Sequence, residues 1–364
     1  MYYGISVYQT SDFTLEGNLE YMKKAGGIGY NLVFTSLHLP EVDYGKTLDG
    51  FKEISKTARE SGMELIADIS PATMRIFGAT CMDLKPFSEF GISFLRADYG
   101  FSPDELSIMT RNEYGINIQI NASTIAKNLL DTLKESGADF GRISACHNFY
   151  PRPETGLSYR AFVEKTLLCK EYNMTVFAFI PSRKGRRGPI YEGLPTLEMH
   201  RDIDSEIAAK HLLYTGVIDG VIFGDAYASE RELIQVVSID PDVIELSIEL
   251  HPGITQQERN IVFLPHHTNR LDAPDCLIRS EESRGYAGIG EKIKPNNTAE
   301  RKAYSVTIDN EDYKRYSGEL QIVLKDLPAD KRVNVAGRIP EDEHILAHQI
   351  KPGKKFRFRE GMKQ

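Results

Sequence analysis

The sequence predicts an α/β protein: a TIM (β/α)₈ barrel followed by a small, mainly β carboxyl-terminal domain. Two observations predict this fold. From Met1 to about Ile239, eight short apolar runs end in polar or charged residues, and most are followed by a helix-like stretch. Their apolar cores are too continuous for a half-solvated antiparallel sheet and suit strands covered on both faces. After Ile239 this alternation gives way to short strand patterns separated by turn residues.

The apolar runs predict the barrel strands in chain order. They lie at residues 4–9, 31–41, 64–70, 94–100, 116–123, 142–156, 176–185 and 220–229. Helix signals lie between them. Ser123 or Thr124 can cap a helix over residues 123–137, and segments 159–173 and 206–216 repeat the pattern. Each of these segments is expected to be a crossover helix between parallel strands.

The chain is expected to divide into a catalytic barrel at residues 1–239 and a second domain at residues 240–364. Strand patterns in the second domain lie at residues 305–310, 318–326, 331–339, 344–350 and 354–360. Segment 266–288 has little apolar periodicity and many charged or hydrogen-bonding residues. We expect this segment to contribute to the functional site, because arginine side chains suit phosphate and carboxylate groups.

Composition limits the classes of protein to which the chain can belong. With 364 residues, 41% of them hydrophobic, and a formal net charge of -8, the chain suits a compact soluble protein and argues against a nucleic-acid partner. The amino terminus lacks a secretory signal pattern, and no run reaches the ~20 apolar residues of a membrane helix. The four cysteines form no CxxC pair. These features predict a cytoplasmic protein with reduced thiols and no membrane partner, and they leave its oligomeric state open.

Active sites of such barrels lie at the carboxyl ends of the strands. The polar residues expected there are Gln9, His38, Glu41, Asp68, Asp98, Asn121, His147, Asn148, Arg183 and Asp225. Two long connections follow the sixth and seventh strands and contain Tyr150, Glu154, Arg186 and Glu192. Long loops at one rim of a barrel are usually functional. Cys146 and the adjacent His147 do not suit the roles of nucleophile and general base, because adjacent strand residues point to opposite faces.

Several long strings of the sequence resemble the bacterial 6-phospho-N-acetylmuramidases. They are GISVY, FTSLHLPE, LRADYGFS, QINAS, CHNFYPRPETGLS, FIPSRKGRRGPIYEGLPTLEMHR and HHTNRLDAPDCLIRSEESR, and the resemblance covers essentially the whole chain. It implies a barrel with a cyclophilin-like carboxyl-terminal domain. It also implies cytoplasmic hydrolysis of N-acetylmuramic acid 6-phosphate linked β-1,4 to N-acetylglucosamine, in the recycling of cell-wall sugars, with no cofactor.

Glycoside cleavage usually needs a carboxylic acid that protonates the leaving oxygen and a second carboxylate. The candidates are the strand-end residues Asp68, Asp98 and Asp225 and the loop residues Glu41, Glu154 and Glu192. Asp98 is the first candidate, because it lies at the end of an apolar strand shortly after an arginine. Its partner carboxylate is expected to be Glu154 or Asp225, and Asp68 ranks after these two. The alternative roles are ordinary ones: Asp225 can cap a helix, and Glu154 can be merely exposed.

The remaining polar residues are expected to bind substrate. His147, Asn148 and Tyr150 would contact sugar, with His38 a weaker candidate. Two anion subsites are expected for the phosphate and the lactyl carboxylate: the run Arg183, Lys184, Arg186 and Arg187 in the seventh loop, and the segment containing Arg279 and Arg284. The other candidates for substrate binding are Gln9, Glu41, Asn121, Glu192, His267, Asn269 and Arg270.

Two other functions fit the same residues. Glu198, His200, Asp225 and His147 could surround a metal ion in a sugar isomerase or metallohydrolase, although no HExxH motif and no cysteine cluster supports a metal site. A sugar-phosphate binding protein without turnover is the second alternative, since binding and catalytic residues share one rim. We therefore expect no metal and a phosphorylated amino-sugar disaccharide as the ligand.

Overall fold

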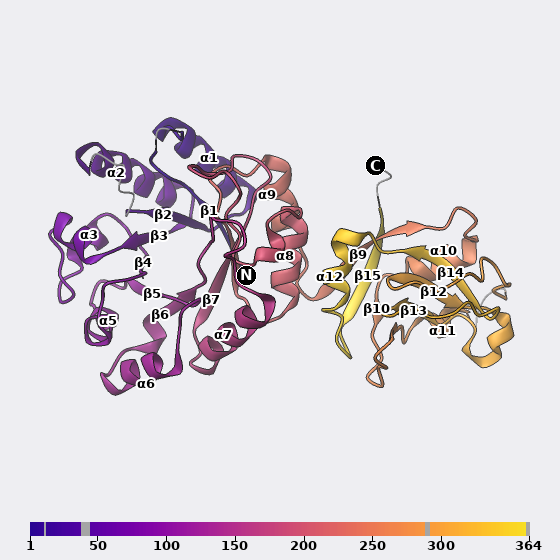
Figure 1. Cartoon of the computed structure of the whole chain (residues 1–364). Helices are drawn as coiled ribbons and strands as arrows, with labels where there is room; N and C mark the ends of the chain where they lie inside the picture. Colours follow the sequence, from indigo (N-terminus) through magenta and orange to yellow (C-terminus); the bar gives the residue numbers. More distant parts are fainter. Residues whose placement is uncertain (11, 38–43, 288–291, 362–364) are drawn as a thin grey trace. The chain divides into compact units, whose positions relative to one another are not determined.

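A computed structural model of the chain describes residues 1–10, 12–37, 44–287 and 292–361 (Figure 1). The chain divides into two compact units, Met1–Ile239 and Asp240–Gln364. Among the described residues, no helix combines the length and the apolar character that a membrane span requires.

The first unit is a closed barrel of eight parallel strands, which confirms the predicted fold (Figure 1). The strands are β1 (Tyr2–Ser6), β2 (Leu32–Ser36), β3 (Glu64–Ile69), β4 (Phe94–Ala97), β5 (Asn117–Asn121), β6 (Ile143–Cys146), β7 (Thr175–Ile180) and β8 (Gly220–Phe223). Each strand pairs with the next along the chain, and β1 closes the ring by pairing with β8. All carboxyl ends therefore lie at one rim.

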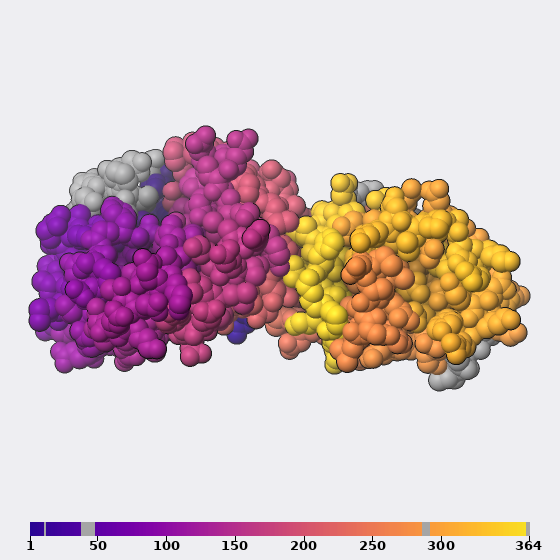
Figure 2. Space-filling model, turned by 60° about the horizontal axis from the view of Figure 1, so that its bottom comes forward, coloured from indigo at the N-terminus to yellow at the C-terminus, as the bar shows by residue number. Residues whose placement is uncertain are grey.

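Helices surround the barrel and connect its strands (Figure 1). They are α1 (Leu15–Ile28), α2 (Tyr44–Glu60), α3 (Pro71–Ile76), α4 (Lys85–Glu89), α5 (Pro103–Thr110), α6 (Lys127–Glu135), α7 (Tyr159–Glu171), α8 (Ser205–Tyr214) and α9 (Glu230–Val237), with 3₁₀ turns η1 (Phe140–Arg142) and η2 (Glu198–His200). Figure 2 shows one face of this unit, most of it covered by the purple and magenta segments.

Helix α6 begins later than the sequence predicts. Its N-cap is Ala126, and no side chain caps it. Ser123, one of the two expected caps, instead accepts a hydrogen bond from the backbone N–H of Asn148, with 2.8 Å between N and Oγ. A hydroxyl that is already bonded to the end of β6 cannot cap a helix three residues later. The apparent helix signal thus belongs to the barrel rim.

The barrel interior is filled by large apolar side chains and is not a pore. The buried cluster consists of Tyr8, Phe13, Leu32, Phe34, Ile66, Phe94, Cys146, Phe177, Phe179, Ile222 and Ala226. Phe34 and Phe179 meet edge to face, with ring centroids 5.3 Å apart. At Gly220 a Cβ would overlap Tyr2 and Phe177, so only glycine fits there. This packing gives the rim a solid apolar floor.

The second unit is built around a seven-stranded sheet, which confirms a mainly β domain. Its strands are β9 (Val243–Leu250), β10 (His267–Thr268), β11 (Leu277–Arg279), β12 (Ser305–Asp309), β13 (Leu320–Val323), β14 (Val333–Arg338) and β15 (Lys355–Glu360), in the order β10-β15-β9-β14-β12-β13-β11. Its helical segments are α10 (Gln256–Val262), α11 (Ser283–Ala287), η3 (Glu311–Tyr316), η4 (Glu341–Glu343) and α12 (His344–Ala347).

One predicted strand is wrong and one strong strand was missed. Residues 344–350 contain helix α12 instead of a strand. Glu343, Leu346, Ala347 and Ile350 are buried, and this spacing of three, four and seven residues is that of a helix face. The missed strand, β9, alternates apolar and polar residues over Val243–Leu250, which is the signal of a half-buried strand.

Candidate active site

The carboxyl ends of β3 and β4 bring two aspartates to one arginine. Asp68 and Arg96 are paired residues on these neighbouring strands, and Asp98 follows β4 directly. Arg96 Nε lies 3.8 Å from Asp68 Oδ1, and Arg96 Nη2 lies 3.1 Å from Asp98 Oδ1. The Arg96 side chain is only 4% exposed. A buried guanidinium needs such carboxylate partners, and here it fixes the positions of both.

Asp68 differs from an ordinary aspartate in its affinity for a proton. Burial raises its pKa to about 7, the negative charge of Asp98 acts in the same direction, and the Arg96 charge opposes both. Its Oδ1 atom is buried and accepts no hydrogen bond within the described part of the chain. The carboxyl group of Asp68 can therefore carry a proton near neutral pH, as a general acid must.

Asp98 is more open to solvent, with 31% of its side chain exposed. Its Oδ1 also accepts a hydrogen bond from Asn121 Nδ2, at 2.9 Å. The Asn121 Oδ1 atom accepts one from the backbone N–H of Ser123, and Asn148 Oδ1 accepts one from Arg96. Together with the Ser123 contact to Asn148, these bonds form a closed polar network around Asp98. The network joins the ends of β4, β5 and β6 and fixes one carboxylate where a ligand can reach it.

His147, predicted to contact sugar, points away from this network. It is completely buried, its Nε2 lies 2.9 Å from Thr166 Oγ1, and its ring packs on Phe162 of α7. Burial chiefly lowers its pKa to about 3, so the ring is neutral at physiological pH. Its Nδ1 lies 3.4 Å from Ser123 Oγ. His147 thus supports the network from behind, as strand alternation requires for the neighbour of Asn148.

Asp225 holds the loop that follows β7. It is fully buried, and its carboxylate accepts hydrogen bonds from the backbone N–H groups of Ser182 (2.9 Å), Arg187 (3.2 Å) and Leu194 (3.2 Å). Burial raises its pKa, although these three hydrogen bonds act against the shift. Glu232 of α9 accepts a further backbone hydrogen bond, from Arg183 at 2.8 Å. Asp225 therefore shapes the loop, and its oxygens are already occupied.

In the loop after β7, two of the predicted arginines face acidic residues of the same loop. Arg183 lies 3.9 Å from the carboxylate of Asp202, and Arg186 lies 3.9 Å from Glu192 and 3.8 Å from Asp202. Arg186 is the more enclosed of the two arginines, since 22% of its side chain is exposed against 43% for Arg183.

In the loop after β6, Glu154 is exposed, and its backbone N–H donates to Glu198. The backbone of Tyr150 is hydrogen-bonded to Pro195 and Arg201. Glu154 is thus not joined to the network around Asp98. Gln9 is half-buried just after β1. His38 and Glu41 lie outside the residues that the structure describes.

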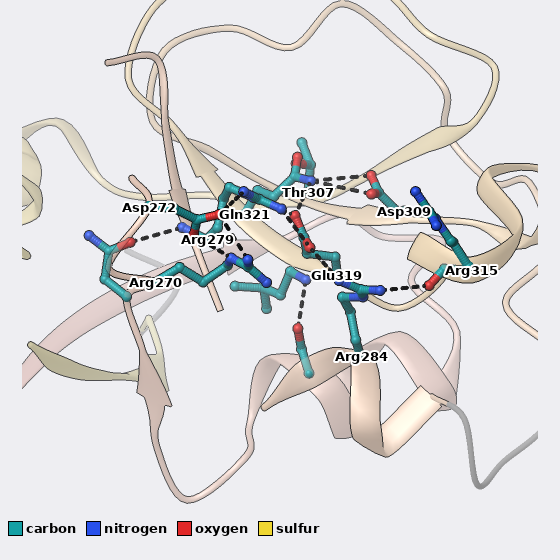
Figure 3. Close-up of polar contacts among 12 residues, drawn as sticks. Arg270, Asp272, Arg279, Arg284, Thr307, Asp309, Arg315, Glu319 and Gln321 are labelled. Carbon is teal, nitrogen blue, oxygen red and sulfur yellow. Dashed lines mark hydrogen bonds and ion pairs between the residues drawn. The ribbon is translucent and has the colours of Figure 1, made fainter. Parts of the chain in front are cut away.

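The predicted residues of the second unit form a network of their own (Figure 3). Arg279 binds both carboxylate oxygens of Glu319, at 2.7 and 3.1 Å, and Arg284 Nη1 lies 3.7 Å from the same carboxylate. Arg270 makes a similar two-bond contact with Asp272, at 2.7 and 2.9 Å. In Figure 3, Arg279 and Arg284 both point toward Glu319. Each predicted arginine of this unit therefore has a carboxylate partner within the unit.

Two further predicted residues of this unit are buried. His267 stacks on Phe356, and its nitrogens contact Ser280 Oγ at 2.9 Å and the Val262 carbonyl at 3.1 Å. Burial lowers its pKa despite the contact with that carbonyl. Asn269 is 2% exposed and bonds the Ile350 carbonyl at 3.0 Å. Both side chains are therefore part of the interior of the second unit.

The residues named for a metal site are engaged elsewhere. Glu198 pairs with Arg201 at 2.6 Å, and His200 Nε2 lies 2.9 Å from His211 Nδ1. In the described ranges, no three His, Cys, Asp or Glu side chains are grouped so that they could hold a metal ion.

Comparisons with known proteins agree with the two-unit architecture. Residues 3–238 match the family model described as 6-phospho-N-acetylmuramidase, N-terminal, and residues 244–359 match its C-terminal counterpart. A crystal structure of an uncharacterized B. cereus protein is 34% identical, with 99% of both chains covered and a TM-score of 0.89. A conserved Enterococcus faecalis protein of unknown function is 35% identical, with 100% of this chain and 97% of that chain covered and a TM-score of 0.75. No curated protein matches.

Proposed function

Because the chain belongs to the 6-phospho-N-acetylmuramidase family of glycoside hydrolases, we propose that it hydrolyses the β-1,4 bond between N-acetylmuramic acid 6-phosphate and N-acetylglucosamine. One observation supports the assignment of the chemistry to residues. Asp68 and Asp98 both contact Arg96, but Asp68 is largely buried and has a raised pKa, whereas Asp98 is partly open to solvent. Carboxyl groups in unlike surroundings are what acid-assisted glycoside cleavage requires.

In this proposal Asp68 is the general acid. Its pKa of about 7 keeps a large fraction of the carboxyl groups protonated near neutral pH. When the proton passes to the leaving glycosidic oxygen, a negative charge forms on Asp68. The Arg96 guanidinium, 3.8 Å away, stabilises that charge without moving. Arg96 is thus a positioning residue that serves both carboxylates.

Asp98 is the second carboxylate. It is ion-paired with Arg96 and hydrogen-bonded to Asn121, and part of its side chain faces solvent. A carboxylate so held can stabilise the positive charge that develops at the anomeric carbon, because it need not reorganise during the reaction. Asn121 and Asn148 carry further polar groups at the same rim and suit sugar hydroxyls.

We also propose that the enzyme acts in the cytoplasm, in the recycling of peptidoglycan sugars. All four cysteines are free thiols, and a reducing compartment maintains that state. A phosphorylated disaccharide would arise when cell-wall fragments are phosphorylated during uptake, which delivers the substrate to the inside of the cell.

The test is to incubate the pure protein with the phosphorylated disaccharide and with its unphosphorylated form, and to follow the release of both sugars by mass spectrometry. We expect cleavage of the phosphorylated compound only. An Asp98→Asn variant should lose turnover and still bind the substrate. Tight binding by the unaltered protein with no cleavage would contradict the proposal and favour a sugar-phosphate binding protein.

A further inference from the structure

We propose that Arg187 binds the phosphate group of the substrate and thereby selects phosphorylated sugars; this inference rests on the proposed function and assigns one of its subsites. Four basic residues occur in the loop after β7, namely Arg183, Lys184, Arg186 and Arg187. Arg187 differs from the other three in the side chains that it contacts.

Arg187 lies over the aromatic floor of the barrel. Its guanidinium carbon is 4.4 Å from the ring centroid of Tyr8 and 5.4 Å from that of Phe149. Phe149 in turn packs on Phe34 and Phe179, with centroids 6.1 and 5.0 Å away. Phe34 and Phe179 belong to β2 and β7, and Tyr8 and Phe149 lie just beyond the carboxyl ends of β1 and β6. The charge of Arg187 is therefore directed over the barrel interior, where a substrate would lie.

Arg187 also lacks the counter-ion that Arg183 and Arg186 have. Within the described ranges, no carboxylate forms an ion pair with it, whereas Arg183 and Arg186 both face Asp202. Its Nε donates to the Gly188 carbonyl at 3.3 Å. A half-buried guanidinium with no carboxylate is poorly compensated, because the rings beneath it supply only a weak attraction. A bound anion would supply the missing charge.

The loop holds Arg187 in place before any ligand arrives. Asp225 accepts its backbone N–H at 3.2 Å, so the buried end of β8 fixes the chain at this residue. Two residues earlier, Gly185 has a positive φ of 54°, and a Cβ there would clash with the backbone oxygen of Tyr227. A cation fixed in this way loses little conformational freedom on binding, which favours affinity. Asp225 is thus a positioning residue for Arg187.

Phosphate is the anion that this position fits. A guanidinium matches phosphate oxygens with two parallel hydrogen bonds, and a phosphate monoester brings close to two negative charges. In the proposed substrate the phosphate and the bond to be cleaved belong to the same sugar ring. Asn148, which bonds Arg96, and Phe149, which lies beneath Arg187, are consecutive residues. The end of β6 therefore connects the anion subsite with the catalytic carboxylates.

The experiment compares Arg187→Gln with Arg231→Gln, which removes the same charge from an exposed position on α9. We expect Arg187→Gln to lower kcat/KM for the phosphorylated disaccharide by roughly 10- to 100-fold, as for a lost charged hydrogen bond. Any slow cleavage of the unphosphorylated form should be unchanged. The Arg231→Gln variant should match the unaltered protein within about twofold. An equal loss on both disaccharides, or no loss, would overturn the assignment.

A binding measurement separates the phosphate from the lactyl carboxylate and does not depend on turnover. Calorimetry would be run with N-acetylglucosamine 6-phosphate, which has only the phosphate, and with N-acetylmuramic acid, which has only the carboxylate. Arg187→Gln should weaken the first ligand alone, and Arg187→Lys should restore part of that affinity. Weakening of the second alone would overturn the phosphate assignment. Failure of the protein to cleave either disaccharide, with phosphate binding still dependent on Arg187, would contradict only the proposed function.

Discussion

Arg187 in the barrel and Arg279 in the second unit show two different uses of the same side chain. Arg279 binds both oxygens of Glu319, whose side chain is 2% exposed, so its charge is neutralised within the protein. Arg187 lies on aromatic rings and has no ion pair to a carboxylate in the described ranges. An arginine that is already paired contributes to the domain interior, whereas one without an acid can take an anion from a ligand.

The buried aspartates of the two units repeat this contrast. Burial raises the pKa of both Asp68 and Asp309 to about 7. Asp309 lies in the sheet of the second unit, where Gln321 contacts both of its oxygens at 3.3 and 3.4 Å. Asp68 instead lies at the barrel rim near the half-buried carboxylate of Asp98. A raised pKa is therefore insufficient to identify a catalytic acid. The carboxylate near Asp309, that of Glu319, is 2% exposed, whereas the carboxylate near Asp68, that of Asp98, is 31% exposed and can be reached by a ligand.

The largest expected effect comes from replacing the acid of the barrel. Asp68→Asn removes the proton donor and should lower kcat for the phosphorylated disaccharide by about 10²- to 10⁴-fold, the usual contribution of general acid catalysis. The measurement is steady-state kinetics near neutral pH, with circular dichroism to confirm that the variant folds. Asp309→Asn is the matched control, because it removes an aspartate with a similarly raised pKa from the second unit.

The pH dependence of the hydrolytic activity is a second test of Asp68. Asp68 must be protonated to act, so the activity should be present below pH 7 and fall about tenfold per unit above it. The fall in activity above pH 7 should persist in Asp309→Asn. It should be absent from the residual activity of Asp68→Asn. Its absence from Asp309→Asn would mean that the two buried acids had been assigned to the wrong roles.

The next largest effect concerns the stability of the second unit. Arg279→Gln leaves Glu319 buried, with the Gln321 amide at 3.3 Å and the Arg284 guanidinium at 3.7 Å. Losing one partner of a buried ion pair costs about 3 kcal/mol, so the free energy of unfolding should fall by about that amount in denaturant titrations. A tenfold rise in KM for the phosphorylated disaccharide with no change in the free energy of unfolding would contradict this structural role. It would mean that Arg279 binds substrate, as the sequence predicts.

Sequence periodicity predicted most of the fold, because parallel barrel strands are buried on both faces and leave a strong apolar signal. It failed in the second unit, where the eight-residue strand β9 was missed despite its alternation, and in short segments. Residues 344–350 carry a helical spacing over less than two turns, which is easily mistaken for alternation. Helix α6 was expected to be capped by Ser123 or Thr124, because serine and threonine are good caps, but the Ser123 hydroxyl bonds to the barrel rim instead. Long-range contacts of this kind leave no local signal.

The candidate site was predictable to the extent that it depends on strand ends. Asp68, Asp98, Asn121 and Asn148 all lie at or just beyond the carboxyl ends of barrel strands, and closing the barrel brings their network together. The position of a residue at a strand end does not reveal whether its oxygens are already hydrogen-bonded. The Asp225 oxygens accept hydrogen bonds from three backbone N–H groups. Such bonds depend on how a long loop folds back on the rim.

Side-chain alternation along the strands was applied only to Cys146 and His147, and it could have been applied further. Because Asn148 faces the rim network, alternation along β6 and its extension turns His147 toward α7. Arg96 could have been ranked higher by the same rule, since it lies two residues before Asp98 and so shares its face.

The smallest expected effect tests the surface under Arg187. Phe149→Leu keeps an apolar side chain at the floor but removes one of the two rings near the guanidinium, 5.4 Å away. A cation–π contact of this kind contributes about 0.5–1 kcal/mol, so KM for the phosphorylated disaccharide should rise about two- to fivefold. Phe140→Leu is the control, because its ring stacks on Tyr172, 5.4 Å away in the loop before β7, and makes no contact with Arg187 in the described structure. An equal rise in both variants would mean that general loosening of the barrel, and not the orientation of Arg187, sets the affinity for substrate.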